Sequence, residues 1–165
     1  MRLPRKALTV ALVALALAGA SCGSREPESV VVVTLDTFRA DRMGTYGNRD
    51  GLTPALDDFA AGAVVFESAS APTPITLPSH TSLFTGRYPT RHGVRNNGTF
   101  TLADAETTLA EALRPAGFRT GAFVGSWVLS RAFGLAQGFE VYDDRFDGPG
   151  AVQPAPGPAA APPRR

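Results

Sequence analysis

The chain has 165 residues, which is room for one domain, and a formal net charge of +1. Because 19% of the residues are charged and 44% are hydrophobic, the composition excludes a strongly basic nucleic-acid-binding protein and a highly charged disordered chain. We therefore expect a globular domain in the middle of the chain and no binding of nucleic acid.

Residues 1–21 have the pattern of a signal peptide. Arg2, Arg5 and Lys6 form a basic start, and the apolar run over residues 7–20 is shorter than a helix that spans a bilayer. The pattern predicts export to the periplasm or the cell envelope.

Cys22 comes directly after this segment, and as the only cysteine it excludes an intrachain disulfide. Its position indicates a bacterial lipoprotein signal in which Cys22 is lipidated. Residues 22–29 would then form a tether, and the protein would meet a membrane only through its lipid anchor. The alternative is cleavage after Ala20 and plain secretion.

Residues 30–35, Val-Val-Val-Val-Thr-Leu, form a continuous β-branched and apolar run. A continuous run, unlike an alternating one, predicts a central parallel strand with both faces buried. The run ends at Asp36, and in open α/β sheets ligands bind at this C-terminal edge of the strands.

Helix and strand signals alternate along the rest of the chain. Helices are predicted from Thr53-Pro54 (with Leu56, Phe59 and Ala60 facing inward), from Thr76, and from a capping box at Thr108 and Glu111 to about Ala116; strands are predicted over residues 63–66, 118–124 and 139–142. This alternation predicts an α/β fold, a layered and mostly parallel sheet flanked by helices.

Residues 73–89 place a hydroxyl group at the start of a helix. Thr76 suits the N-cap, Pro78 the first turn, and Gly86 the position after the C-terminus, where φ is positive. A helix N-terminus is a natural seat for phosphate or sulfate, so the Thr76 hydroxyl would lie beside a group that it could attack. The alternative is that Thr76 only caps the helix.

Several short motifs follow one another from residue 36 to residue 94. They are Asp36-Thr37-Phe38-Arg39-Ala40-Asp41 with Gly44-Thr45-Tyr46-Gly47, Thr76-Leu77-Pro78-Ser79-His80 with Thr85-Gly86-Arg87-Tyr88-Pro89, and Arg91-His92-Gly93-Val94. In this order they resemble the N-terminal half of the sulfatase family, which belongs to the alkaline-phosphatase superfamily. The resemblance implies that residues 30–147 are the N-terminal part of a sulfatase-like catalytic domain.

The resemblance also implies roles for two residues. Asp36 stands at the first metal-binding aspartate of the family, which implies a divalent cofactor such as Zn, Ca or Mn, while Thr37 replaces the usual second aspartate. Thr76 stands at the nucleophile, which in active sulfatases is Cys or Ser oxidised to formylglycine. Threonine is a secondary alcohol, so no formylglycine is expected. The implied nucleophile is a metal-activated alkoxide, with Thr76 both catalytic and a metal ligand.

Other positions depart from the sulfatase pattern. His80 replaces an arginine of the signature, and residues 125–128 lack the Lys and His of a later motif. The Thr-x-Pro-x-His pattern also resembles the nucleotide pyrophosphatase/phosphodiesterase branch, in which threonine is the nucleophile. In that branch an asparagine holds a phosphate oxygen, and Asn97 stands at its position here, which implies a catalytic and substrate-binding role. His80 is a second candidate for binding the substrate. The alternatives are a turn at Asn96-Asn97-Gly98 and a packing role for His80.

The predicted function is the N-terminal part of an exported, metal-dependent sulfatase-like hydrolase or transferase. Its substrate would be a small-molecule, glycan or lipid ester of sulfate or phosphate, with phosphate favoured because residue 76 is threonine. The remaining metal ligands of the family lie beyond this length, so we expect a fold that is incomplete at the C-terminus. The alternative is a truncated, lipid-anchored fragment or degenerate paralogue that at most binds an anion, which leaves open whether this chain is itself an enzyme.

Two smaller features also keep alternatives open. Arg39 and Arg87 suit either a bound anion or local ion pairs. Residues 148–165 are rich in Pro, Ala and Gly and predict a low-complexity tail, a linker, or the product of a shifted reading frame.

Overall fold

The computed structural model describes residues 29–146. The predicted signal peptide, Cys22 and the low-complexity tail lie outside the described residues. The chain divides into two units after Val30, and the helices and strands below all lie after that boundary.

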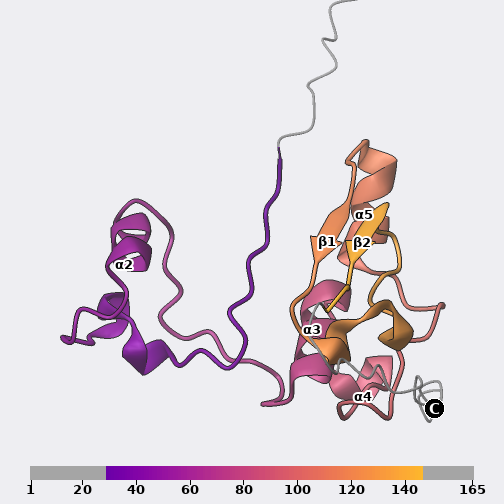
Figure 1. The fold of residues 1–165 in the computed structure, drawn as a ribbon, viewed down its shortest axis with the longest axis horizontal. Coiled ribbons are helices and arrows are strands. Elements are labelled where there is room, and N and C mark those ends of the chain that lie inside the picture. The colour runs from indigo at the N-terminus through magenta and orange to yellow at the C-terminus, as the bar shows by residue number, and fades with distance from the viewer. Residues whose placement is uncertain (1–28, 147–165) are drawn as a thin grey trace, which may run out of the picture. The chain divides into compact units, whose positions relative to one another are not determined.

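Short helices dominate the described part of the chain, and one small sheet accompanies them (Figure 1). In chain order the elements are η1 (Ala40–Arg42), η2 (Gly44–Tyr46), α2 (Pro54–Ala61), α3 (Thr76–Thr85), α4 (Pro89–His92), α5 (Leu109–Leu113), η3 (Arg114–Ala116), β1 (Gly121–Phe123), η4 (Trp127–Leu129), η5 (Arg131–Phe133) and β2 (Val141–Asp143), where η marks a 3-10 helix. No helix within residues 29–146 has the length and apolar character that crossing a membrane requires.

The helix predicted from Thr76 is confirmed as α3, but the prediction that Thr76 is its N-cap is wrong. Ile75, in an extended conformation, holds the N-cap position, and Thr76 is the first helical residue. Gly86 ends the helix with φ of 65°, in the left-handed region that glycine adopts without strain. Because the Thr76 side chain does not cap the helix, its hydroxyl is available for another partner.

The sheet consists of β1 and β2, which run parallel with Gly121 opposite Val141 and Phe123 opposite Asp143. Two predicted strands and the parallel pairing are therefore confirmed, although each strand is shorter than predicted. The described part of the chain is therefore mixed α/β, with a parallel sheet of two strands in place of the larger layered sheet that was predicted.

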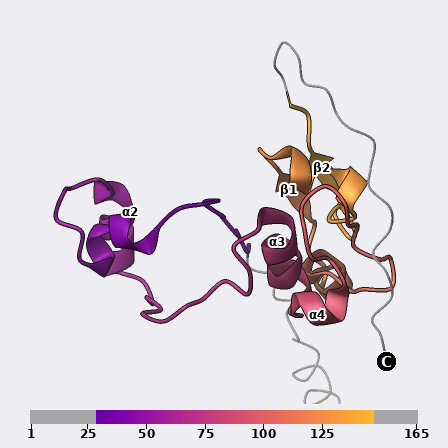
Figure 2. The ribbon, with the colours of Figure 1, turned by 90° about the horizontal axis from the view of Figure 1, so that it is seen from below.

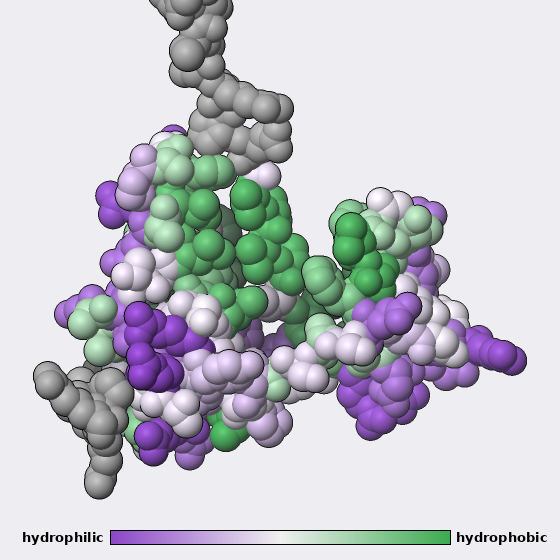
Figure 3. All heavy atoms as spheres, turned by 180° about the vertical axis from the view of Figure 1, so that it is seen from behind, coloured by the Kyte–Doolittle hydropathy of each residue, from purple (hydrophilic) through white to green (hydrophobic). Residues whose placement is uncertain are grey.

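The prediction of a buried central strand over residues 30–35 is wrong for this structure, as is the strand over residues 63–66. Neither segment pairs with another strand of the described chain, and Val31, Val33 and Val64 are 81%, 75% and 83% exposed. A β-branched run favours extended backbone, but a strand forms only when a partner supplies the ladder hydrogen bonds. Figure 3, seen from behind the view of Figure 1, shows hydrophobic side chains exposed on that side of the molecule.

The helix predicted at Thr53-Pro54 is confirmed as α2, but its apolar residues do not face inward as predicted. Phe59 is 76% exposed, Leu56 is also exposed and Ala60 is half-buried. The local signals fix the helix, whereas burial depends on a packing surface, which residues 29–146 do not provide for this face.

The hydrophobic core lies against α3. Its buried members are Leu77, Val94, Leu102, Leu129, Phe133 and Leu135. Trp127 packs edge-on against Phe133, with ring centroids 4.7 Å apart. Helix α3 contacts α4, α5 and η4, and Figure 2 shows α3 beside α4. Since Leu77 is fully buried, the core fixes the backbone directly after Thr76.

Candidate active site

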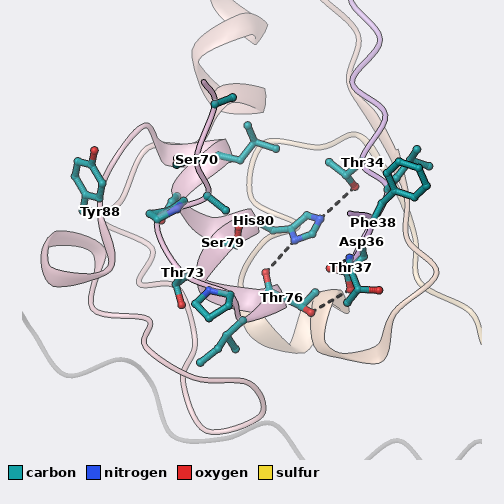
Figure 4. Close-up of a pocket in the computed structure, with 18 of the residues that line it drawn as sticks. Thr34, Asp36, Thr37, Phe38, Ser70, Thr73, Thr76, Ser79, His80 and Tyr88 are labelled. Atoms are coloured by element: carbon teal, nitrogen blue, oxygen red, sulfur yellow. Dashed lines mark hydrogen bonds between the residues drawn. The ribbon is translucent and has the colours of Figure 1, made fainter. Parts of the chain in front are cut away.

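Two predicted site residues from distant segments form a direct hydrogen bond. The Thr76 hydroxyl donates to Asp36 Oδ2 over 3.0 Å (Figure 4). Thr76 comes from the first position of α3, and Asp36 from the turn that follows residues 30–35. The structure thus brings the predicted nucleophile and the predicted metal ligand together.

A tight turn over residues 35–38 presents Asp36 to α3. The Phe38 N–H donates to the Leu35 carbonyl, and the Thr37 N–H donates to Asp36 Oδ1 at 3.1 Å. Thr37 has φ of 57°, and it is the only non-glycine residue with positive φ in the described chain. A β-branched residue in this region stores on the order of 1–3 kcal/mol of strain, which is typical of functional turns.

His80 lies one helical turn after Thr76 and contacts both segments of the site. Its Nδ1 is 2.9 Å from the Thr76 carbonyl oxygen, and its Nε2 is 3.1 Å from Thr34 Oγ1 (Figure 4). The ring is buried, and both of its nitrogens have partners within the chain. This arrangement favours a positioning role, and the substrate-binding role of His80 stays a prediction.

Asn97 reaches the same helix end from the loop after α4. Its Oδ1 accepts the Leu77 N–H at 2.9 Å, so the asparagine satisfies one of the open N–H groups at the start of α3. The structure records no partner for its Nδ2 among the described residues. Asn97 therefore contacts the N-terminus of α3 directly, and its Nδ2–H groups are available to an anion placed there. The predicted catalytic role remains a prediction.

A cavity of about 940 Å³ opens at this site. Asp36, Thr76 and His80 line its polar part, together with Thr34 and Thr37. The rest of the wall comes from residues 69–75 and the C-terminal half of α3 with the residues that follow it. The Thr76 hydroxyl therefore faces a space that an ester group can enter.

The oxygens of Asp36 and Thr76 fit a shared divalent cation. Two oxygen ligands of one small cation lie roughly 3 Å apart, which agrees with the 3.0 Å between Thr76 Oγ1 and Asp36 Oδ2. Within residues 29–146 no group of three or more His, Cys, Asp and Glu residues is arranged to hold a metal. The pair thus supplies part of a ligand set, and a complete site needs further oxygen or nitrogen ligands.

Both arginines that suited an anion form ion pairs with nearby carboxylates. Arg39 pairs with Asp41 two residues on, and the two groups hold each other charged: the arginine lowers the pKa of the carboxyl, and the carboxylate raises the pKa of the guanidinium. Arg87 Nε lies 3.3 Å from Glu106 Oε2. The structure therefore favours the ion-pair alternative for Arg39 and Arg87.

His92 has a structural role, which is the favoured interpretation of an isolated histidine in the sequence. The Val94 N–H donates to its Nδ1, so the proton of the neutral ring is on Nε2, which donates to Ser82 Oγ at 3.0 Å. The Ser82 hydroxyl in turn donates to the Pro78 carbonyl. Burial lowers the pKa of His92, and the negative charge of Glu106 opposes that shift. A ring with its proton on Nε2 cannot act as a base toward Ser82, so this group joins α3 to α4.

Thr34 is the site residue that sequence reasoning missed. No sequence signal pointed to it, because its contact with His80 joins segments 46 positions apart in the chain.

The comparisons with known proteins agree on one family. The protein-family model described as Sulfatase matches residues 28–153. Arylsulfatase A from Bos taurus is 36% identical over 129 residues, which cover 74% of this chain and 24% of that protein. Steryl-sulfatase from Mus musculus is 33% identical over 134 residues, 74% of this chain and 21% of that protein.

A third relative also matches over only a small share of its own length. An ulvan-active sulfatase from Formosa agariphila is 35% identical over 101 residues, 61% of this chain and 19% of that protein. The chain therefore spans a quarter or less of the length of these relatives, which are sulfatases rather than phosphodiesterases. No solved structure matches the chain at a significant level.

Proposed function

This chain belongs to the sulfatase family, and we propose that it forms the N-terminal part of a hydrolase or transferase that acts on sulfate or phosphate esters through Thr76. The observation that supports this proposal is the 3.0 Å hydrogen bond from Thr76 Oγ1 to Asp36 Oδ2 at the wall of a cavity. A hydroxyl and a carboxylate from segments forty residues apart meet at a helix N-terminus, where developing negative charge is stabilised.

In the proposed reaction the Thr76 oxygen attacks the phosphorus or sulfur atom and forms a covalent ester. The bond to the leaving alcohol breaks, and water or another alcohol then cleaves the new ester and releases Thr76. The hydrogen bond to Asp36 Oδ2 fixes the direction of the Thr76 oxygen. The proton of the Thr76 hydroxyl leaves with the departing alcohol, and the attacking water or alcohol returns a proton to Thr76 in the second step. A divalent cation shared by Asp36 and Thr76 would lower the pKa of the hydroxyl when bound. The Asn97 Nδ2–H groups would donate to a non-bridging oxygen of the substrate.

The two substrate classes rest on different grounds. The names of the relatives imply sulfate esters. The threonine favours phosphate esters, because it cannot be converted to formylglycine and a threonine alkoxide is the nucleophile of the phosphodiesterase branch that the motif resembles. We favour a phosphate ester, with a sulfate ester as the second candidate.

A direct test uses the complete gene product that contains these residues. Turnover is measured with p-nitrophenyl sulfate, p-nitrophenyl phosphate and bis(p-nitrophenyl) phosphate, and the covalent adduct is sought by mass spectrometry on the peptide that contains Thr76. Thr76→Ala should abolish both turnover and adduct, Thr76→Ser should retain both in part, and Thr85→Val is the control on the same helix. Turnover and an adduct that persist in Thr76→Ala would refute the proposal. Anion binding without turnover in the native protein would support the non-catalytic alternative instead.

We also propose export and lipid attachment through Cys22, which rest on the sequence pattern of residues 1–22. Cells fed a palmitate analogue should label the protein, and Cys22→Ser should remove the label. Secretion of unlabelled native protein would favour cleavage after Ala20.

A further inference from the structure

We propose that Thr34 and His80 form a positioning pair that holds Asp36 against Thr76. The inference rests on the proposed roles of Asp36 and Thr76, and it assigns a function to two residues that need not touch the reacting atoms. His80 joins the two segments of the site, because one ring nitrogen contacts the residue of the nucleophile and the other contacts the extended segment.

The two contacts are neighbours in the structure. Thr34 and Asp36 are two residues apart in the chain, with Asp36 in the turn that follows residues 30–35. Thr76 and His80 are four residues apart on a helix, which corresponds to a rise of about 6 Å. Because Thr76 and His80 share one face of α3, the Asp36–Thr76 and Thr34–His80 bonds form side by side (Figure 4).

The hydrogen bonds also define where the proton of His80 lies. The Thr76 carbonyl can only accept, so His80 Nδ1 carries the proton and donates to it at 2.9 Å. In the neutral ring Nε2 is then an acceptor, and the Thr34 hydroxyl donates to it at 3.1 Å. The ring thus places the Thr34 hydroxyl relative to the backbone of Thr76 itself.

Within the described residues, side chains connect the segment over residues 30–36 to α3. Residues 30–36 pair with no strand in the described chain. Within residues 29–146 the hydrogen bonds that join this segment to α3 are the two side-chain bonds, from Thr34 to His80 and from Thr76 to Asp36. Without the Thr34–His80 bond, only the Thr76–Asp36 bond would hold Asp36 against α3. That second bond must itself change during the reaction.

The test uses Thr34→Val in the complete gene product, because valine has the shape of threonine and deletes only the hydroxyl of an exposed residue. Misplacement of a reacting group by about 1 Å costs on the order of 10²-fold in rate, so we expect kcat to fall roughly 10- to 100-fold with little change in KM. Thr34→Ser should recover most of the rate, and His80→Gln should fall as Thr34→Val does. Thr85→Val is the matched control, because it removes a hydroxyl on the same helix that donates to the Thr81 carbonyl and accepts the Arg87 N–H, and Thr85 does not line the cavity.

A second readout does not depend on activity. The ¹⁵N shifts of the His80 ring should report a protonated Nδ1 and an unprotonated Nε2, and Thr34→Val should move the Nε2 signal. If Thr76→Ala abolishes turnover but Thr34→Val keeps the native kcat, the positioning pair is refuted and the proposed function stands. If Thr76→Ala retains turnover, the proposed function is refuted. If the ¹⁵N shift of His80 Nε2 is unchanged in Thr34→Val, the positioning pair is refuted whatever the activity. An unprotonated His80 Nδ1 in the native protein would refute the proposal directly.

Discussion

Thr76 opens helix α3, and its hydroxyl donates to the carboxylate of Asp36, forty residues earlier in the chain, at 3.0 Å. The bond crosses between a helix and a turn that share no backbone hydrogen bond in the described chain. Neither residue depends on this bond for its own local structure, since the core fixes the start of α3 through Leu77 and a tight turn presents Asp36. The chemistry of the pair can therefore be changed with little effect on folding.

Asp36→Asn should separate the charge of this residue from its shape. The amide oxygen can still accept the Thr76 hydroxyl, but the negative charge is lost, so affinity for Mn²⁺, Ca²⁺ or Zn²⁺ should fall at least ~10-fold. Isothermal titration of the complete gene product with each ion measures this affinity. The free energy of unfolding should change by no more than about 1 kcal/mol, because the group is exposed. Unchanged affinity for all three ions would show that Asp36 is not a metal ligand.

Two substitutions of Asn97 should divide its structural role from its proposed catalytic role. Asn97→Ala leaves the Leu77 N–H without its partner, and losing such a cap costs about 1 kcal/mol of unfolding free energy. Asn97→Asp keeps the acceptor oxygen and places negative charge at a helix N-terminus, so stability should be retained. It removes both N–H donors, however, so kcat should fall on the order of 10²-fold.

Urea unfolding and steady-state kinetics on the same preparations check both parts of this prediction. If Asn97→Asp turns over ester as fast as the native protein, Asn97 is a cap and not a substrate-binding residue. Loss of stability in Asn97→Asp comparable to that in Asn97→Ala would contradict the capping role.

The local parts of the fold could be predicted from sequence because their signals are complete within a few residues. Thr108 and Glu111 form both hydrogen bonds of the predicted capping box, and Gly86 ends α3 as expected. The N-cap of α3 was misplaced by one residue for a physical reason. The Thr76 hydroxyl donates its hydrogen bond to Asp36, and the capping rule considers only residues near in sequence, so it does not include a partner forty residues away.

The errors concern features that depend on distant partners. The valine run over residues 30–35 has the composition of a buried strand, yet burial and pairing need neighbours that residues 29–146 do not supply. The motifs predicted the site residues one by one. The contact between Thr34 and His80 could not be predicted, because it depends on where the two segments lie in space. Likewise, nothing in the spacing of Ser82 and His92 reveals the direction of their hydrogen bond.

His92 should make the stability of this domain fall in mild acid. Burial lowers its folded pKa below the ordinary value of 6.5, so the unfolded chain binds a proton more readily than the native one. The contribution is fully present above the unfolded pKa and is lost as the pH falls through the folded pKa, with a slope of at most about 1.4 kcal/mol per pH unit. Urea unfolding between pH 8 and pH 5 should show the decline.

His92→Gln is the matched variant, because its amide can donate to Ser82 and does not titrate. Its stability should be nearly independent of pH over this range. The chain contains two histidines, so a native decline that persists in His92→Gln would assign the effect to another group.

Thr108 should contribute more to stability than an ordinary helix cap. Its hydroxyl accepts the Glu111 N–H and donates to the Gln137 carbonyl at 2.9 Å, while its own N–H donates to Glu111 Oε2. The residue is almost fully buried, so Thr108→Ala leaves two polar groups without partners. We expect a loss of about 2 kcal/mol in the free energy of unfolding, measured by urea titration.

Thr108→Ser is the control for this substitution because serine keeps the hydroxyl and loses only a methyl group. It should retain most of the stability, since Ser and Thr cap helices about equally well. Helix α5 has only five residues, too few to be stable by itself, so its cap and its contact with Gln137 are needed for it to form. Equal losses in Thr108→Ser and Thr108→Ala would show that packing of the methyl group, and not the capping box, stabilises this end of α5.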